Sequence, residues 1–447
     1  MKHTIVIRQI NSQKTHHIRK IVLRPNHDEK SVLESLREYP TSFWLDSSGG
    51  PKELCNQSFY GTSPKYYICG HLNEVNLIDC RDVPLEQRLY TAKSQTFAVN
   101  CFDFLEEKIK DEKNNKDGIF VGYFSYDLSD FFFAYFDKTE NITNSVIARK
   151  DEVLTKQSPF VMCYEIASPS ARNDVLHSNM TNSEYLEKVK LIKEEIRAGN
   201  VYQVNLTREY SIEIDNVNEL DLYLRLRSAS PNPYGCFFKT PFVTILSSSP
   251  EEFLFIKDGH IRTRPIKGTL PKNVFDIDSK NQAENIMIVD LERNDLGKIC
   301  EYGSIIAKRL LEVESYRHLN HVVSTVEGKL KPEVTLRQIF EALFPGGSIT
   351  GAPKIAAMKL IDKIEPTKRG AYTGSFGYIK TDGTMNFNIL IRTIFIRPIA
   401  LGGCLVSFNV GGGIVADSDP ESELEEIKLK AKGIVDALEA GNNLCLM

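Results

Sequence analysis

Residues 252–264 read EFLFIKDGHIRTR, two β-rich runs joined by the turn residues Lys257, Asp258 and Gly259. Aromatic and β-branched residues favour strands, and an Asp-Gly pair between two such runs favours a tight hairpin turn. The stretch therefore predicts an antiparallel β-hairpin near the middle of the chain.

Similar runs flank this hairpin. Residues 201–214 and 234–249 are β-rich, and further strands are predicted at 372–380, 387–397 and 404–410. Helical patterns occur around 280–292, 336–343, 353–364 and 420–439. Another helix follows Thr181, which has capping-box spacing to Glu184, and it ends before Gly199. Because strands and helices cluster rather than alternate, the pattern favours an α+β fold.

The bulk properties narrow the class of protein. The 447 residues carry a net charge of −4, so nothing indicates a nucleic-acid partner. There is no long apolar run, and the start MKHTIVIRQI is a poor signal peptide, so we expect neither a membrane span nor secretion. Nine dispersed cysteines without a CxxC pair favour reduced thiols in a cytoplasm. The histidine spacings make a zinc site improbable.

Acidic residues form the first candidate site. Glu284 lies on one predicted helix, and Glu423, Glu426 and Lys430 lie along one side of another, which Ser418 or Asp419 would cap. Carboxylates on two helices can hold Mg²⁺ and leave positions for water and an anionic substrate. From spacing alone, a solvated acidic face is the commoner outcome.

Glycine-rich segments and a buried cation indicate an anionic ligand. Residues 344–354 (FPGGSITGAPK) and 409–418 (NVGGGIVADS) can offer backbone amides to a carboxylate or phosphate, although each alone is more often a structural turn. Neither matches a nucleotide-binding motif. Arg392 lies inside an apolar run, where a bidentate carboxylate partner would account for its position.

The loop RTRPIKGTLPK (residues 262–272) places Lys267 between Pro-Ile and Gly-Thr. Glu251 precedes it by sixteen residues, and the hairpin between them can bring the two together. A buried lysine can act as a nucleophile and a neighbouring glutamic acid can protonate a leaving group. The alternative is an ordinary salt bridge. His321 stands alone, which is typical of a satisfied core histidine.

Read in order, eight motifs resemble the chorismate-utilising enzymes over roughly residues 181–435, and GYFSYDL (122–128) is the best match before them. The motifs are YQVNLTR (202–208), SSSPE (247–251), RPIKGT (264–269), AENIMIVDLERNDL (283–296), FPGGSITGAPK (344–354), GSFGYI (374–379), IRT (391–393) and GGGIVADSDPE (411–421). The resemblance implies two large, mostly antiparallel sheets packed as a sandwich with helices outside. It also implies an N-terminal region, 1–170, woven together with a chorismate-binding catalytic region, 171–447, and the polar stretch 167–182 is the candidate linker.

The resemblance also assigns roles to individual residues. Mg²⁺ would be held by Glu284 and Glu426, with Glu423 reaching it through water, while Asn281 replaces a family acid. Glu251 would be the general acid and Lys267 the covalent nucleophile. The residues implied to bind or line the substrate are Ser348, His321, Tyr378, Arg392, Lys430 and the amides of Gly411, Gly412 and Gly413.

Two positions sort the branches of this family. Gln203 stands where the isochorismate and salicylate branch has a lysine that activates water, and Lys267 stands where anthranilate synthases have alanine. PIKGT resembles the aminodeoxychorismate synthase branch, which implies that chorismate is aminated with ammonia from a separate glutamine amidotransferase subunit. Neither a glutaminase nor a lyase domain is expected within the chain. Anthranilate synthase component I and a non-catalytic chorismate-binding paralogue are the alternatives.

The resemblance leaves one further point open. The family holds a tryptophan pocket near its N-terminal sheet, and FWLDSS (43–48) and SPNPYGCFF (230–238) fall in the corresponding regions. Ordinary hydrophobic core explains both segments equally well.

Overall fold

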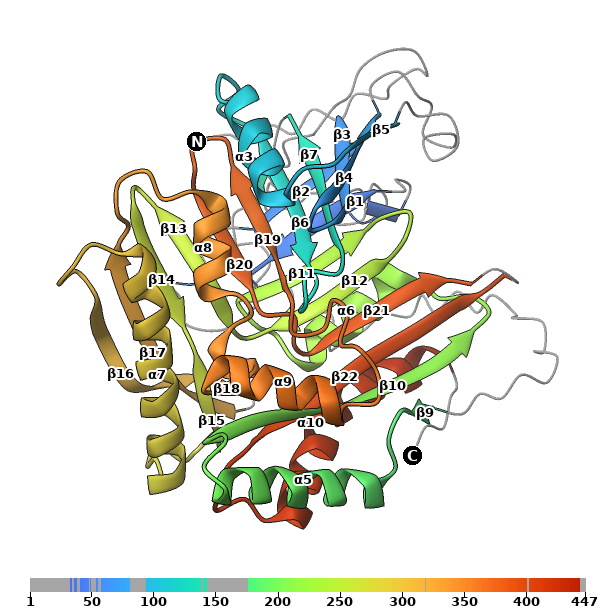
Figure 1. The fold of residues 1–447 in the computed structure, drawn as a ribbon. Helices are drawn as coiled ribbons and strands as arrows, with labels where there is room; N and C mark the ends of the chain where they lie inside the picture. Colours follow the sequence, from blue (N-terminus) through green and yellow to red (C-terminus); the bar gives the residue numbers. More distant parts are fainter. Residues whose placement is uncertain are drawn as a thin grey trace.

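The computed structural model describes residues 41–47, 58–80, 94–137, 140–142, 176–317, 319–399 and 402–442, with Leu33, Leu36, Arg37, Gly49 and Leu54. Its strands form two antiparallel sheets (Figure 1). The ten-stranded sheet runs in the order β18 (Gly351–Ala352), β10 (Gln203–Ile214), β22 (Cys404–Ile414), β21 (Thr393–Pro398), β12 (Thr244–Ser249), β11 (Tyr234–Lys239), β1 (Ser42–Asp46), β2 (Ser58–Thr62) and β8 (Glu140–Ile142), and β9 (His177–Ser178) pairs with β10.

The second sheet has twelve strands. Their order is β15 (Ile266–Pro271), β17 (Leu319–Lys329), β14 (His260–Arg264), β13 (Glu252–Lys257), β20 (Met385–Asn388), β19 (Ser375–Lys380), β6 (Ile119–Phe124), β7 (Phe131–Phe136), β3 (Tyr66–His71), β4 (Glu74–Asp79) and β5 (Ser94–Phe97), and β16 (Ile306–Ser315) pairs with β17. The helices are α3 (Cys101–Asp111), α5 (Asn182–Arg197), α6 (Glu219–Ala229), α7 (Ser279–Ile299), α8 (Leu336–Leu343), α9 (Lys354–Ile364) and α10 (Pro420–Asn442), with a short 3₁₀ turn η2 (Gly347–Ile349).

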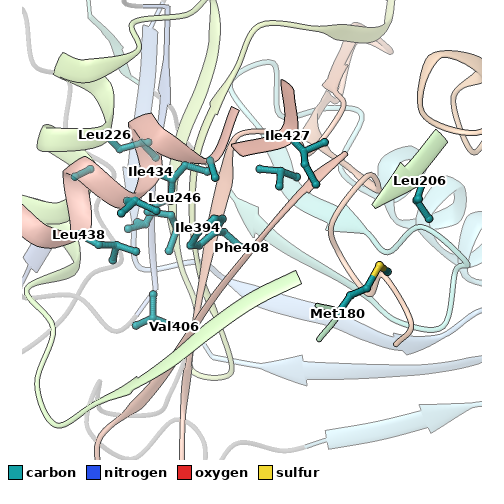
Figure 2. Close-up of a cluster of buried hydrophobic side chains, with 14 of the residues drawn as sticks. Met180, Leu206, Leu226, Leu246, Ile394, Val406, Phe408, Ile427, Ile434 and Leu438 are labelled. Atoms are coloured by element: carbon teal, nitrogen blue, oxygen red, sulfur yellow. The ribbon is translucent and has the colours of Figure 1, made fainter. Parts of the chain in front are cut away.

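Three hydrophobic clusters hold these layers together. One cluster lies between the sheets and includes Phe43, Val121 and Phe395. A second joins the outer face of the ten-stranded sheet to α5, α6, α9 and α10. Figure 2 shows part of it, with Leu226, Ile434 and Leu438 from two helices near Val406 and Phe408 of β22. A third packs α3, α7 and α8 against the twelve-stranded sheet. The α+β sandwich expected from the sequence is therefore confirmed.

Strands from before residue 143 enter both sheets. β1, β2 and β8 extend the ten-stranded sheet, whereas β3 to β7 extend the other. The proposed division between residues 1–170 and 171–447 stays a prediction, because its boundary lies outside the described residues, as does most of the candidate linker 167–182.

Local sequence signals account for several of these elements. The hairpin β13–β14 turns at Asp258 and Gly259, whose φ values of 51° and 73° suit a tight turn. α5 begins with the predicted capping box, in which Thr181 accepts from the Glu184 N–H and Glu184 reaches back. Gly199 follows α5 with a φ of 78°. α7 continues to Ile299, beyond the predicted end at 292.

The predicted strand 387–397 is wrong in one respect. It is divided between β20, which belongs to the twelve-stranded sheet, and β21, which belongs to the ten-stranded sheet. Arg392 lies in the connection with a φ of 51°, a value that strands do not adopt. Its run of apolar neighbours reflects a buried crossing between sheets and not one continuous strand. No helix of the described part of the chain is long and apolar enough to span a membrane.

Candidate active site

The candidate site forms where the chain crosses from one sheet to the other. Glu251 links β12 to β13, and Arg392 links β20 to β21, so two crossings meet here. They are held together by backbone hydrogen bonds from the Ser248 N–H to the Arg392 carbonyl, 3.1 Å, and from the Ile389 N–H to the Glu251 carbonyl, 3.1 Å. The two functional side chains therefore have a rigid base that both sheets contribute to.

Lys267 reaches this junction from an irregular strand. The pairing of β15 with β17 shifts between Ile266 and Thr269, and Gly268 has a φ of 98°, which a glycine adopts without strain. Lys267 is 9% exposed, and its Nζ donates to the Ser348 carbonyl at 2.8 Å. Glu251 is 3% exposed and accepts from the Ile266 N–H at 3.2 Å. The structure thus brings Lys267 and Glu251 to one site.

Burial shifts both groups toward their neutral forms. Desolvation lowers the pKa of Lys267, although Glu284 and Glu251 oppose the shift. Desolvation raises the pKa of Glu251, although Ser348, the Ile266 N–H and Lys267 oppose it. A neutral amine beside a protonated carboxyl is the pair that nucleophilic attack with acid assistance needs.

Ser348 lies in a loop that is fixed from two sides. Arg369 donates to the Ile349 carbonyl at 2.8 Å and to the Asn205 carbonyl at 2.7 Å. On the other side, the Gly347 N–H donates to Glu292 Oε1 at 3.1 Å. The Ser348 hydroxyl is buried near Glu251, but its geometry falls short of a hydrogen bond to any described group. It is therefore available to a substrate.

The predicted carboxylates converge from α7 and α10. Glu284 interacts electrostatically with Lys267, Glu423 and Glu426. Burial and the two other carboxylates raise its pKa, and Lys267 opposes this shift. Burial acts to raise the pKa of Glu426, but Lys430, 2.7 Å away, brings it below its ordinary value. Asp419, and not Ser418, caps α10 by accepting from the Ser422 N–H, while Ser418 donates to Glu423.

Whether these residues suit Mg²⁺ depends on how many ligands the protein must supply. Among the described residues no three acidic, histidine or cysteine side chains stand close enough to form a complete metal site. Mg²⁺ commonly uses one or two protein carboxylates together with waters and substrate oxygens. Glu284 and Glu426, which both interact electrostatically with Lys267, fit that requirement. Asn281 donates from its amide to the helix cap Asp278, and its Oδ1 lies against Gly268, where a Cβ would come within 3.0 Å of it.

Sequence reasoning missed Lys280. Its Nζ lies 3.2 Å from Glu423 Oε1 and 4.0 Å from Glu284 Oε1, so it joins the two acidic helices. Its spacing of four residues before Glu284 is a signal that could have found it.

The glycines of β22 form one wall of the site. β21 pairs with β22 only as far as Phe408, so residues 409–414 are paired on the β10 side alone among the described strands. Alternate amides of Gly411 to Gly413 are therefore left for a ligand. A Cβ on Gly413 would lie 2.3 Å from Gln203 Nε2 and 3.5 Å from Lys267 Nζ. The close approach of these groups requires glycine.

The sequence indicates only that Gln203 cannot act as a base. It is fully buried, and neither atom of its amide has a hydrogen-bond partner among the described residues. An unpaired buried amide is costly, so a polar ligand beside Lys267 would stabilise this arrangement.

His321 and Arg392 complete the substrate side. His321 is 1% exposed, and burial, reinforced by the nearby Arg392 and Lys430, lowers its pKa well below the usual range. Its Nδ1 lies 3.2 Å from Thr269 Oγ1, and its Nε2 has no partner among the described residues. Arg392 is half-buried, makes only a 3.4 Å contact to Ser230 Oγ and forms no ion pair with a described carboxylate. Both side chains can therefore serve an anionic ligand.

Tyr378 is the predicted site residue that the structure does not place with the others. Strand alternation in β19 puts it on the face of Phe376 and Lys380, and its ring lies 5.7 Å from the ring of Phe59. It lines a separate cavity of about 410 Å³. The segments 43–48 and 230–238, which the sequence allows either as core or as pocket wall, both border this cavity. Their lining residues are Leu45, Asp46, Ser47, Pro233, Tyr234 and Gly235.

Comparisons with known proteins show which family the chain resembles. Residues 83–436 match the family of chorismate binding enzymes. Aminodeoxychorismate synthase component 1 of Salmonella typhimurium is 40% identical over 283 residues, which cover 61% of each chain. Aminodeoxychorismate synthase of Streptomyces pristinaespiralis is 31% identical over 94% of this chain and 65% of its own length. An anthranilate synthase component I-like protein of Synechocystis is 37% identical over 61% of this chain and 58% of its own.

Each of these relatives is matched over less than two thirds of its length. Among solved structures, anthranilate synthase component I from Streptococcus pneumoniae is similar with a TM-score of 0.65 and 26% identity, over 85% of this chain and 92% of that one. An isochorismate synthase from Bacillus anthracis shares the fold, with a TM-score of 0.66 at 17% identity.

Proposed function

Because the chain belongs to the chorismate-binding enzyme family, we propose that it converts chorismate and ammonia into 4-amino-4-deoxychorismate. The observation that carries this proposal is the buried Lys267 amine beside the buried Glu251 carboxyl. In the relatives named aminodeoxychorismate synthase the match covers only part of the protein, so the activity is inferred from the site.

The reaction divides into two displacements. The Lys267 amine attacks C2 of chorismate while Glu251 gives its proton to the C4 hydroxyl, and the hydroxyl departs as water as both ring double bonds shift toward C4. Ammonia then adds at C4, both double bonds shift back, and the bond between C2 and the lysine breaks with return of its electron pair to the lysine nitrogen. The proton lost by the new amino group restores Glu251. The enolpyruvyl group stays in place.

Several residues are suited to hold the reactants. Arg392, Lys430 and the alternate amides of Gly411 to Gly413 that β10 does not pair offer positive or donating groups to carboxylates, and His321 and Ser348 offer unpaired polar atoms. Gln203 is placed to hold ammonia beside Lys267. Tyr378 lines the other cavity, and its contact with the substrate stays a prediction.

Glu284 and Glu426 would hold Mg²⁺ directly, and Glu423 would reach it through water. When bound, the ion would neutralise a substrate carboxylate that otherwise repels these acids. Ammonia would come from a glutamine amidotransferase subunit, and ammonium at high concentration would replace it less efficiently. The product would leave as aminodeoxychorismate.

The test is incubation of the protein with chorismate, Mg²⁺ and ammonium, followed by mass-spectrometric identification of the product. Aminodeoxychorismate is expected. Fluorescent anthranilate formed without a second enzyme would instead support the alternative, anthranilate synthase component I. The similarity to the Synechocystis and Streptococcus pneumoniae proteins is the reason for this alternative. Unchanged chorismate would support a non-catalytic binding protein.

A further inference from the structure

Glu292 is a buried acid for which the proposed reaction gives no role. It lies on α7, two helical turns after Glu284, and is 4% exposed. Its Oε1 accepts the Gly347 N–H at 3.1 Å, a contact that joins α7 to the loop before α9. A buried carboxyl that binds a backbone amide far along the chain fixes the position of that backbone.

The loop held by Glu292 is the one that orients the nucleophile. Gly347 directly precedes Ser348, whose carbonyl accepts from Lys267 Nζ at 2.8 Å. A Cβ on Gly347 would lie 2.9 Å from Glu292 Oε1 and 2.8 Å from Leu291 Cδ2, so the loop backbone is pressed against α7 at this point. A displacement of Gly347 would therefore move the acceptor of the Lys267 amine.

We propose that Glu292 is a positioning residue, which aims the Lys267 amine by holding the Gly347 amide and through it the Ser348 carbonyl. The ionised form of Glu292 holds this amide more strongly than the neutral form, because a charge-assisted hydrogen bond is roughly twice as strong as a neutral one. The functional consequence rests on the proposed reaction, whereas the placement of Lys267 does not.

Burial and the charged groups around Glu292 bring its pKa close to neutral pH. Burial raises its pKa to about 7, Lys354 of α9 acts to lower it, and Asp295 of α7 and Glu251 act to raise it. Lys354 is itself 2.5 Å from Asp295 Oδ2, and Lys298 is 2.7 Å from Asp295 Oδ1. Glu292 therefore gains charge, and tightens its hold on the loop, as the pH rises through neutrality.

The test compares Glu292→Ala, Glu292→Gln and a control, Glu341→Gln, which alters an exposed carboxylate of α8. Trace acetylation of the folded proteins, followed by peptide mass spectrometry, reports how firmly Lys267 is held, whatever reaction the protein catalyses. We expect Lys267 labelling to rise roughly tenfold in Glu292→Ala, the loss that matches one hydrogen bond to a charged group. We expect a smaller rise in Glu292→Gln, which keeps an acceptor oxygen but loses the charge, and no change in the control.

Kinetics supply the second readout. In Glu292→Ala, kcat should fall roughly tenfold with little change in the KM for chorismate, because the amine and not the substrate is displaced. The wild-type kcat should rise as the pH passes about 7, where Glu292 ionises. The Glu292→Gln variant should lack this rise but keep any pH dependence of kcat that other titratable groups cause.

The outcomes separate the two proposals. Wild-type Lys267 labelling in Glu292→Ala would overturn the positioning role, and so would a Glu292→Gln pH profile that superimposes on the wild type. If Glu292→Ala does not fold, the Glu292→Gln profile decides. A wild-type protein that makes no aminodeoxychorismate would refute the proposed function, and the labelling would still decide the role of Glu292.

Discussion

Gly413→Ala tests whether the end of β22 forms the wall of the active site. The new methyl group would lie 2.3 Å from Gln203 Nε2, well inside the ~3.5 Å at which such atoms attract. Gln203 is fully buried, so its amide cannot move into solvent. Gly413 is not among the residues with positive φ, and alanine can therefore adopt its backbone conformation. The expected effect is steric and confined to the site.

The size of the effect follows from this overlap. Forcing an extra methyl group into a packed site costs about 1–3 kcal/mol. If Gln203 and Lys267 are displaced from their working positions, the same free energy appears in the transition state, and kcat/KM falls roughly 5- to 150-fold.

Steady-state formation of aminodeoxychorismate measures kcat/KM, and thermal unfolding shows that the fold persists. Gly433→Ala is the matched control, because a Cβ there meets nothing within 4 Å. It lies inside α10, where alanine should stabilise the helix by about 0.5–1 kcal/mol and leave activity unchanged. Equal kcat/KM values for the two variants would refute the reasoning.

A double mutant identifies the partner in the overlap. Gln203→Ala removes the amide that the new methyl group meets, so Gly413→Ala should cost much less in that background than in the wild type. Additive losses would show that the methyl group acts on Lys267 or on the glycine amides instead.

Three further predictions address the chemistry, the stability and the substrate. Lys267→Ala should lower aminodeoxychorismate formation on the order of a thousandfold or more, because it removes the proposed nucleophile, while chorismate binding measured by calorimetry persists. An undiminished rate would remove the covalent role, and fluorescence would reveal any leak toward anthranilate from the resulting Pro-Ile-Ala-Gly-Thr loop. Glu292→Gln should gain stability over the wild type as the pH rises. The folded-state pKa of Glu292 is raised from an ordinary 4.5 to about 7. This group therefore does not lower the stability of the wild type below about pH 4.5, but it costs about 3 kcal/mol as the pH rises from there to about 7, and the loss persists at higher pH. Urea unfolding at about pH 5 and about pH 8 measures the difference between the two proteins, and a constant difference would contradict the buried ionisation. Arg392→Lys should raise the KM for chorismate roughly tenfold or more, because lysine cannot form the two parallel hydrogen bonds to a carboxylate. An unchanged KM would place the substrate carboxylate elsewhere.

Local signals in the sequence predicted much of the fold. The turn at Asp258 and Gly259 and the cap at Thr181 depend on neighbouring residues only, and both form as expected. The hairpin also brings Glu251 to Lys267, because it fixes the geometry between them. Such features are encoded within a few residues and need no knowledge of the remaining chain.

Other features depend on partners that are distant in sequence. The run around Arg392 looks like one strand because both halves are buried, yet the halves belong to different sheets. Tyr378 belongs to a matching motif, but the pairing of β19 with β6 and β20 decides which face it occupies. In the sequence Glu292 resembles Asp290, the exposed acid of α7, and its burial becomes apparent only when Gly347 is placed against it.

The junction of the two sheets favours the protonation states that the proposed chemistry needs. In water Lys267 and Glu251 would both ionise and form the ordinary salt bridge that the sequence alone allows. Burying that ion pair would cost more than burying the neutral pair, because two charges would lose their hydration. Burial at the sheet crossing therefore lowers the pKa of Lys267 and raises that of Glu251, so the same desolvation favours an unprotonated, nucleophilic amine and a carboxyl that still carries a proton to donate. A change that admits water to the junction should restore the salt bridge and abolish catalysis without unfolding the protein.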